Sequence, residues 1–272
     1  MSTTDRHLRL RKALIAKAKS YKTKDVAVPL SSGVDSHCAL FACLEAGLNV
    51  TVYSFHVKGI ESRDFKIAKN TAKVFGLPFV EVLLPDSVPR LIADVKALAA
   101  FGCTSKTDFE CFWPMWYMIP KIKQKVFFTG HGADSLYCMS RKASQHFAGR
   151  EDEFRKQAFA SKKSFQRGHI ESLCETHGIQ YCPIFCNDKI LGIFEGSSKK
   201  ELHQPVQKAV SRNAFPEYFE RIKVYAHQPF QLGDSDIRDR FERILLESAL
   251  NSQGYKSVVG VYNELVRKYG PK

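Results

Sequence analysis

The sequence predicts an α/β protein built on a doubly wound parallel sheet, with a smaller helical lobe toward the C-terminal end. Three observations lead to this prediction. Short β-type runs alternate with helix-length segments through the first half of the chain. Helical patterns dominate from residue 168 onward. The 272 residues are 44% apolar, which suits one large domain or one domain with a lobe.

The prediction of a parallel sheet rests on the first half of the chain. Runs rich in β-branched, aromatic or other apolar residues predict strands at 25–30, 50–57, 79–84 and 126–129. Helices are expected between and after them at 36–45, 62–75, 87–101, 108–123 and from 133 onward. Gly47 and Gly76 follow two of these helices, where glycine commonly ends a helix. This alternation is typical of parallel strands joined by right-handed crossovers.

The second half predicts the lobe. Residues 149–168 are charged and poorly periodic, so a linker or a mobile surface segment is expected there. Further helices are expected at 168–177, 187–195, 198–212, 215–222, 236–250 and 257–269. The predicted organisation is a basic N-terminal helix (1–24), an α/β core (25–148) and a mostly helical C-terminal lobe (149–272).

Composition and charge narrow the class of protein. No run approaches the ~18 consecutive apolar residues of a membrane span, and the N-terminal segment lacks the apolar core of a secretory signal. A cytoplasmic protein without membrane contact is therefore expected. Forty-one basic against 28 acidic residues leave a net charge of +13. Eight basic residues lie in 1–24 and eight more in 141–167, which indicates either solvated helix faces or a polyanionic partner such as a nucleic acid.

The eight cysteines are expected to be reduced and mostly buried, as is usual in a cytoplasmic protein. One group, Cys174, His177, Cys182 and Cys186, has four soft ligands within 13 residues. A metal site is one interpretation of this spacing, and buried thiols are the favoured one.

The segment Ser31-Ser-Gly-Val-Asp-Ser36 lies directly between a predicted strand and a predicted helix. In a parallel sheet such a turn lies at the carboxyl edge, where ligands bind. Small residues allow close approach of a phosphate, and the following helix presents free N–H groups to it. Asp35 would repel a phosphate unless a cation lies between them, which favours Mg²⁺. A simple turn with a helix cap is the alternative interpretation.

A second segment, Thr129-Gly-His-Gly-Ala-Asp-Ser135, has the same position after a predicted strand. It only partly matches the dinucleotide-binding pattern G-x-G-x-x-G, because Ser135 stands where the third glycine belongs. We expect this turn to face the first one across the sheet edge. Asp134 would then supply a second carboxylate to the same Mg²⁺ ion.

These segments carry a resemblance. Residues 31–36 resemble the S-G-G-x-D-S pyrophosphate loop of the PP-loop ATP pyrophosphatases. More narrowly, the chain is similar to the synthetase domain of asparagine synthetases and their β-lactam synthetase relatives. The similarity includes residues 52–82, 129–135, 178–196 and 227–235. It implies an adenine nucleotide alpha-hydrolase-like fold that uses ATP and Mg²⁺.

The resemblance also implies an activity. ATP would be cleaved between its α and β phosphates, a substrate carboxylate would become an acyl-adenylate, and an amine would attack it. This is the chemistry of an AMP-forming ligase or amidotransferase. Adenylation depends on an aligned carboxylate, Mg²⁺ and charge neutralisation on pyrophosphate rather than on a strong protein nucleophile.

The same resemblance assigns roles to residues. Ser31, Gly33 and Ser36 would hold pyrophosphate, with Ser32 in the same loop. Asp35 and Asp134 would hold Mg²⁺. Adenosine would lie against the end of the second strand, and Gly130 would line the acceptor side. The adenosine-flanking residues would be Ser54, Phe55 and Val57.

Several positions depart from the family pattern. Ser32 replaces the second glycine of the loop, which is tolerable if its φ stays negative. His131 stands where the family has a catalytic glutamate, and it could deprotonate an attacking amine. His227 stands where the family has a lysine whose positive charge neutralises phosphate. Lys223 is a candidate substitute for that lysine. These changes put asparagine itself in doubt as the product.

The sequence leaves three functions open. The first is a ligase acting on a small carboxylate. The second is an enzyme that modifies a nucleobase in tRNA or DNA through an adenylated intermediate, with residues 1–24 and 141–167 binding the nucleic acid. The third is an inactive nucleotide-binding relative. No glutaminase domain is seen before the first strand, so the amine is expected to be free, internal to the substrate, or supplied by a separate ammonia-producing partner.

Overall fold

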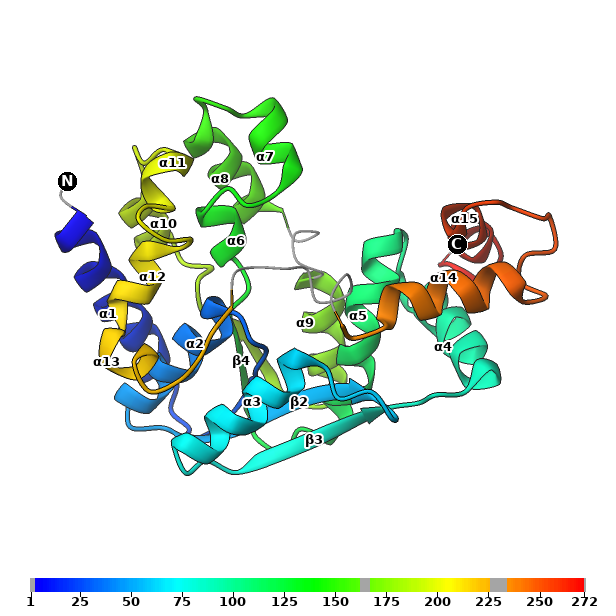
Figure 1. The fold of residues 1–272 in the computed structure, drawn as a ribbon, viewed down its shortest axis with the longest axis horizontal. Helices are drawn as coiled ribbons and strands as arrows, with labels where there is room; N and C mark the ends of the chain where they lie inside the picture. Colours follow the sequence, from blue (N-terminus) through cyan, green and yellow to red (C-terminus); the bar gives the residue numbers. More distant parts are fainter. Residues whose placement is uncertain (1–2, 162–166, 226–233, 272) are drawn as a thin grey trace.

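A computed structural model describes residues 3–161, 167–225 and 234–271 of the chain. It contains a five-stranded parallel sheet in the order β3-β2-β1-β4-β5. Three of these strands, β2, β3 and β4, are labelled in Figure 1. The strands are β1 (Asp25–Pro29), β2 (Asn49–Val57), β3 (Phe79–Leu84), β4 (Val126–Thr129) and β5 (Gln180–Pro183). The predicted α/β class and its four expected strands are confirmed.

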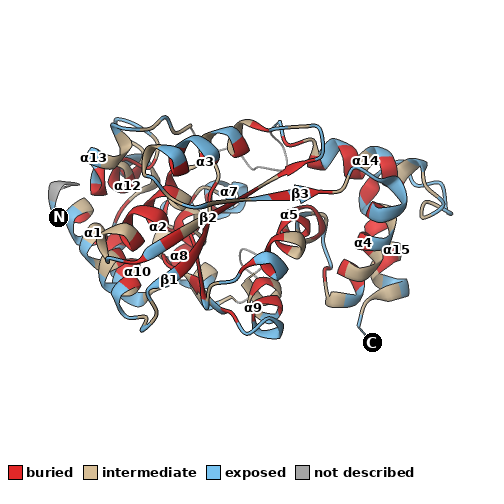
Figure 2. Ribbon diagram, turned by 90° about the horizontal axis from the view of Figure 1, so that it is seen from below, coloured by how far each residue is buried: buried red, intermediate tan, exposed pale blue. Residues whose placement is uncertain are grey.

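Helices cover both faces of the sheet, as a doubly wound fold requires. One core joins the sheet residues Val26, Val28, Val52 and Phe128 to helices on one side. A second core joins Ala27, Tyr53, Val82 and Phe127, which alternate with them, to helices on the other side. Figure 2 shows the buried residues concentrated along the sheet and on the inner sides of the helices. Because successive side chains along each strand point to opposite faces of the sheet, they pack into two separate cores.

The helices of the first half follow the expected order. They are α1 (Thr3–Lys19), α2 (Val34–Glu45), α3 (Arg63–Val74), α4 (Val88–Phe101), α5 (Lys106–Met118), the 3₁₀ helix η1 (Ile119–Lys121) and α6 (Ala133–Leu136). Ser62, Ser87 and Ser105 cap three of them with side-chain hydrogen bonds to backbone N–H groups. Pro114 lies inside α5 without ending it.

The helices of the second half are shorter. They are α7 (Arg141–His146), α8 (Glu151–Ala160), α9 (Arg167–Thr176), α10 (Asp188–Phe194), α11 (Lys199–Leu202), α12 (Ala209–Ala214), α13 (Pro216–Phe219), α14 (Ile237–Glu247) and α15 (Val258–Tyr269).

Three features of this half differ from the expectation. The range 149–168 contains the helix α8, which is anchored by the fully buried Arg155 through bonds to the carbonyl oxygens of Leu136 and Ser197. The single helix expected at 198–212 is divided into α11 and α12. The fifth strand, β5, lies between the helices expected at 168–177 and 187–195, where no strand was expected, and pairs with β4. Four residues with one polar exposed end are too few to show a strand period in the sequence.

Helix α1 is part of the packed core. Leu10, Leu14 and Ala18 are fully buried against α2, α10 and α12. Arg6 donates to the carbonyl oxygen of Ile193 at 3.1 Å, and Arg11 pairs with Glu45 and Glu217. Two of its basic groups are thus held by the fold. In the part of the chain that the structure describes, no helix has the length and hydropathy needed to cross a bilayer.

Candidate active site

A cleft of about 620 Å³ opens at the carboxyl edge of the sheet, beside the ends of β1 and β4. β1 and β4 are neighbours in the sheet, so the turns that follow them lie side by side. Both turns singled out in the sequence line this cleft, including every residue from Ser31 to Ser36 and the run Thr129–Gly132. The structure therefore brings the two predicted segments together.

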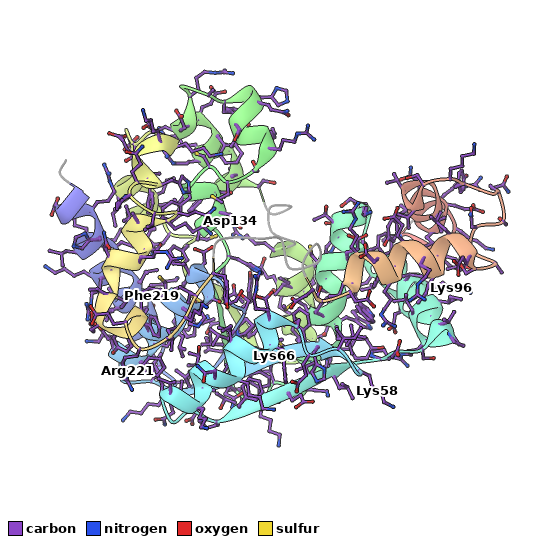
Figure 3. All side chains as sticks on the ribbon, viewed as in Figure 1. Lys58, Lys66, Lys96, Asp134, Phe219 and Arg221 are labelled. Atoms are coloured by element: carbon purple, nitrogen blue, oxygen red, sulfur yellow. The ribbon has the colours of Figure 1, made fainter. Side chains whose placement is uncertain are left out.

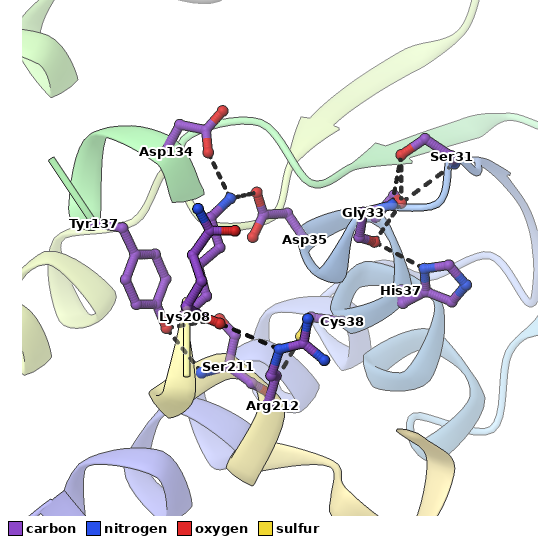
Figure 4. Close-up of polar contacts among 12 residues, drawn as sticks. Ser31, Gly33, Asp35, His37, Cys38, Asp134, Tyr137, Lys208, Ser211 and Arg212 are labelled. Carbon is purple, nitrogen blue, oxygen red and sulfur yellow. Dashed lines mark hydrogen bonds and ion pairs between the residues drawn. The ribbon is translucent and has the colours of Figure 1, made fainter. Parts of the chain in front are cut away.

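The first turn is ordered by its own serines. Gly33 N donates to Ser31 Oγ at 3.1 Å, Ser36 Oγ donates to the Gly33 carbonyl at 3.1 Å, and Ser31 N donates to Ser36 Oγ at 3.3 Å (Figure 4). Ser32 is not among the residues with positive φ, which satisfies the condition on its replacement of glycine. The loop leads into α2, whose N-cap is Gly33, so the first N–H groups of the helix follow this turn directly.

Asp64 on α3 forms hydrogen bonds that hold the same turn. Asp64 Oδ1 accepts a bond from Ser32 N at 2.8 Å and another from the Ser32 hydroxyl. Tyr225 N donates to the Ser32 carbonyl at 3.1 Å, and the Arg63 guanidinium lies 4.3 Å from the Tyr225 ring centroid. Arg63, Asp64 and Tyr225 all line the cleft. They form its wall on the α3 side.

Below the loop, His37 fixes the first turn of α2. It is fully buried, its Nδ1 lies 2.8 Å from the Gly33 carbonyl, and its Nε2 lies 3.0 Å from Thr71 Oγ1. Burial lowers the pKa of His37 to about 4. A neutral ring with its proton on Nδ1 satisfies both contacts, since it donates to Gly33 and accepts from Thr71.

The two carboxylates predicted to hold Mg²⁺ converge on one lysine. Lys208 Nζ lies 2.5 Å from Asp134 Oδ1 and also pairs with Asp35 Oδ2 (Figure 4). The Lys208 side chain is only 3% exposed. Its backbone has the left-handed φ of 57°, a conformation that costs free energy for a residue with a side chain. The ammonium group stands between the carboxylates as a fixed positive charge.

The electrostatics of this group are strongly coupled. Burial raises the pKa of Asp35 to about 6, against the lowering effect of Lys208, and Asp134 raises it further. Burial acts to lower the pKa of Lys208, but the two carboxylates outweigh it and the net direction is upward. Lys208 is therefore charged at neutral pH, and two acids within reach of one cation favour a second cation.

The residues present fit a magnesium ion. Asp35 Oδ1 is buried and has no hydrogen-bond partner among the residues that the structure describes. A buried carboxylate oxygen with unused lone pairs is costly unless a donor or cation reaches it. Carboxylate oxygens beside a phosphate-binding turn are the donors that Mg²⁺ prefers. Asp35 and Asp134 would hold the ion, and the serine turn would hold the phosphates.

The end of β2 forms the wall next to the first turn. Ser54 and Phe55 line the cleft, and Ser54 Oγ donates to the Leu30 carbonyl at 2.9 Å. Val57 is buried in the core that also contains residues of α4 and α5, and it does not line the cleft. Helix α5 also lines the cleft, with a largely apolar surface made of Thr107, Cys111, Met115 and Met118. This surface suits a flat or apolar ligand group.

The second turn places His131 at the cleft. Its Nδ1 lies 2.7 Å from the Tyr181 hydroxyl on β5. Burial lowers the pKa of His131 to about 4, although Asp134 acts to raise it. The imidazole is therefore neutral at physiological pH.

The remaining predicted residues have different outcomes. Lys223 is exposed, with its Nζ 5.3 Å from the Tyr225 ring centroid, and it does not line the cleft. His227 lies outside the described residues, as does most of 227–235. Cys174 and Cys182 lie in different cores. Among the residues that the structure describes, no three His, Cys, Asp or Glu side chains gather as a metal site, and all eight cysteines are free thiols.

Sequence reasoning did not single out Lys208. It was expected to lie inside a helix, but it precedes α12 in a left-handed conformation. Pro205 within the expected helix was the available signal, because proline disfavours a helix interior. Nothing in the local sequence indicates that this lysine, 74 residues after Asp134, reaches both acids.

Residues 10–217 match a protein family described as asparagine synthase, and this range includes both turns and Lys208. Among solved structures, the chain is similar to NMN synthetase from Francisella tularensis, with 13% sequence identity, 84% of this chain and 99% of that chain covered, and a TM-score of 0.39. That structural similarity is too low to bear on function. No curated protein matches the chain.

Proposed function

The chain belongs to the asparagine synthase family, and from this premise we propose that it is an ATP-dependent ligase that activates a carboxylate by adenylation. In the first half-reaction a substrate carboxylate oxygen would attack the α-phosphorus of ATP. The bond between the α-phosphorus and the bridging oxygen breaks, and pyrophosphate leaves. In the second half-reaction an amine attacks the acyl carbon, the amide bond forms, and AMP leaves with the electron pair of the broken C–O bond.

One observation carries the proposal. Asp35 and Asp134, from the ends of two neighbouring strands, meet at Lys208 Nζ beside a serine turn that can cradle phosphates. A triphosphate tail needs backbone donors, a fixed cation and ligands for Mg²⁺ at one place. When bound, Mg²⁺ would neutralise charge on the departing pyrophosphate.

The protein's own residues account for the other requirements. Lys208 would turn from the carboxylates to a phosphate oxygen. The two carboxylates keep it charged against the effect of burial, and its buried position keeps it close. Ser31, Ser36 and the first N–H groups of α2 would donate to the β and γ phosphates. Phe55 and the apolar surface of α5 would contain the adenosine. His131, on the β4–β5 side, would face the reacting carbonyl.

The test is ATP–pyrophosphate exchange with purified full-length protein and Mg²⁺. Labelled pyrophosphate is expected to enter ATP only when a carboxylate that the enzyme activates is present, so a panel of carboxylates is screened. Asp35→Asn and Asp134→Asn should each abolish exchange. Asp188→Asn, on the surface helix α10, is the matched control and should retain it. Exchange unaffected by loss of Asp35 would overturn the proposal.

A second candidate substrate is a nucleobase in tRNA or DNA. The observation that favours it is the basic rim of the cleft, where Arg63 from α3 and the exposed Arg141 from α7 line the opening. Adding RNA and DNA to the same exchange assay separates the candidates, because a nucleic-acid substrate would stimulate turnover without any added carboxylate. Absence of turnover with every substrate would instead favour the inactive nucleotide-binding relative.

A further inference from the structure

A hydrogen-bonded chain of three side chains runs beside the cleft. Thr129 at the end of β4 donates from Oγ1 to the Tyr181 hydroxyl at 3.3 Å. The Tyr181 oxygen lies 2.7 Å from His131 Nδ1. Tyr181 comes from β5 and does not itself line the cleft, whereas His131 does. The tyrosine therefore contacts the histidine from outside the cleft lining.

The positions of the protons among Thr129, Tyr181 and His131 follow from the number of protons that each side chain can donate. A phenol has one proton, and the Tyr181 oxygen already accepts a bond from Thr129. Among the described residues Tyr181 has no other hydrogen-bond partner, so its own buried proton is satisfied only if His131 Nδ1 accepts it. A neutral imidazole that accepts at Nδ1 carries its proton on Nε2.

The burial of both rings agrees with this assignment. Burial holds the pKa of His131 near 4, with Arg167 acting in the same direction and Asp134 against it, so the doubly protonated ring is not the neutral-pH form. Burial also raises the pKa of the Tyr181 phenol, which therefore keeps its proton. The pair is a neutral donor and a neutral acceptor.

We propose that Tyr181 is a positioning residue that fixes His131 as the Nε2–H tautomer, so that His131 offers the cleft a hydrogen-bond donor rather than a base. The catalytic part of this inference rests on the proposed function. As the amine attacks the acyl-adenylate, the carbonyl electron pair moves to oxygen, and Nε2–H would donate to that oxygen. The proton released by the amine passes to water, since Nδ1 is held by Tyr181.

The tautomer can be measured without any substrate. Full-length protein labelled with ¹⁵N-histidine is examined by long-range ¹H–¹⁵N correlation at neutral pH, and His131→Gln identifies the His131 signals. An unprotonated Nδ1 with a protonated Nε2 is expected. Tyr181→Phe should shift the Nδ1 signal and mix the tautomers, whereas Tyr53→Phe, which loses a bond to Gln124 instead, should leave it unchanged. A protonated Nδ1 in the wild type, or no change in Tyr181→Phe, would overturn the assignment.

Rates of amide formation by His131 variants distinguish a hydrogen-bond donor from a base at this position. His131→Ala should slow amide formation roughly 100-fold, the usual effect of losing one oxyanion donor. His131→Gln supplies an N–H and should recover part of this loss, whereas His131→Glu supplies only an acceptor and should not. A larger recovery with glutamate would show a base and contradict the donor role. If the protein proves to have no ligase activity, the spectrum still decides the tautomer, so the two failures are distinguishable.

Discussion

The backbone at Gly130 touches the backbone at Asp35. A Cβ atom added to Gly130 would lie 2.6 Å from the carbonyl carbon of Asp35 and 2.8 Å from the nitrogen of Ser36. Both contacts are with main-chain atoms, which cannot rotate away. Glycine at this position is therefore what lets the turn after β4 approach the serine turn at 31–36 closely enough for Asp134 and Asp35 to share Lys208.

This contact predicts that Gly130→Ala separates the two turns. The variant should lose most ATP–pyrophosphate exchange, and its stability should fall by about 1–3 kcal/mol, the usual effect of overpacking. Urea unfolding and exchange rates measure the two effects. Gly192→Ala is the control, because no atom lies within 4 Å of its added Cβ and its φ is not positive. A fully active Gly130→Ala would show that the close approach is dispensable.

Replacing Lys208 should reveal the cation site. Lys208→Met leaves two carboxylates beside each other without their shared partner, so the free energy of unfolding should fall by about 3 kcal/mol in the absence of divalent cations. Mg²⁺ should then raise the melting temperature of the variant more than that of the wild type, since it replaces the lost charge. ATP turnover should be lost because the phosphate partner is gone.

Differential scanning calorimetry with and without Mg²⁺ tests this directly. Lys223→Met is the matched control, since Lys223 is exposed and outside the cleft, and its response to Mg²⁺ should equal that of the wild type. An equal Mg²⁺ response in Lys208→Met would mean that the two acids do not hold the ion.

The convergence of Asp35 and Asp134 could be predicted from sequence because it follows from topology. Each aspartate lies in the first turn of the helix that follows a parallel strand, and parallel strands end at one edge of the sheet. Lys208 could not be found in this way, since its position depends on an irregular left-handed turn and on tertiary packing. Tyr181 was missed because β5 was not recognised as a strand, and only the sheet order brings it behind His131.

Acid should destabilise the protein through His37. Its pKa is about 4 in the folded state and about 6.5 in an unfolded chain. Below pH 6.5 the unfolded chain binds a proton that the folded protein does not, so stability is present above that pH and is lost as the pH falls toward 4. Between pH 7 and 5 this single group should contribute a loss of about 2 kcal/mol.

The check is urea unfolding of wild type and His37→Asn at both pH values. The asparagine amide can still donate to the Gly33 carbonyl but does not titrate, so the variant should lose about 2 kcal/mol less between pH 7 and 5. Thr71→Val, which removes only the partner of Nε2, should keep the pH dependence. Equal slopes for wild type and His37→Asn would show that another group is responsible.

The two basic segments, 1–24 and 141–167, lead to a final prediction about nucleic-acid binding. Deleting 1–24 is not a usable test, because Leu10, Leu14 and Ala18 of α1 are core residues and the truncated protein should unfold. Exposed basic residues can be changed instead. Lys12, Lys19 and Lys22 represent the N-terminal segment, and Arg141, Lys142 and Lys156 represent the segment next to the cleft. Each set is replaced by glutamine, and binding to RNA and DNA is measured over a range of salt concentrations.

If a nucleic acid is the substrate, it must reach the cleft, and only the second set includes a residue that lines it. The 141–156 triple variant should therefore weaken binding and reduce the slope of log K against log salt by up to about 3, since each lost phosphate contact removes roughly 0.9. The N-terminal triple variant should leave the slope nearly unchanged, because α1 packs against α2, α10 and α12 on the side remote from α5 and α9 (Figures 1 and 3). The opposite pattern would place the nucleic acid away from the catalytic residues and would count against a nucleobase as the substrate.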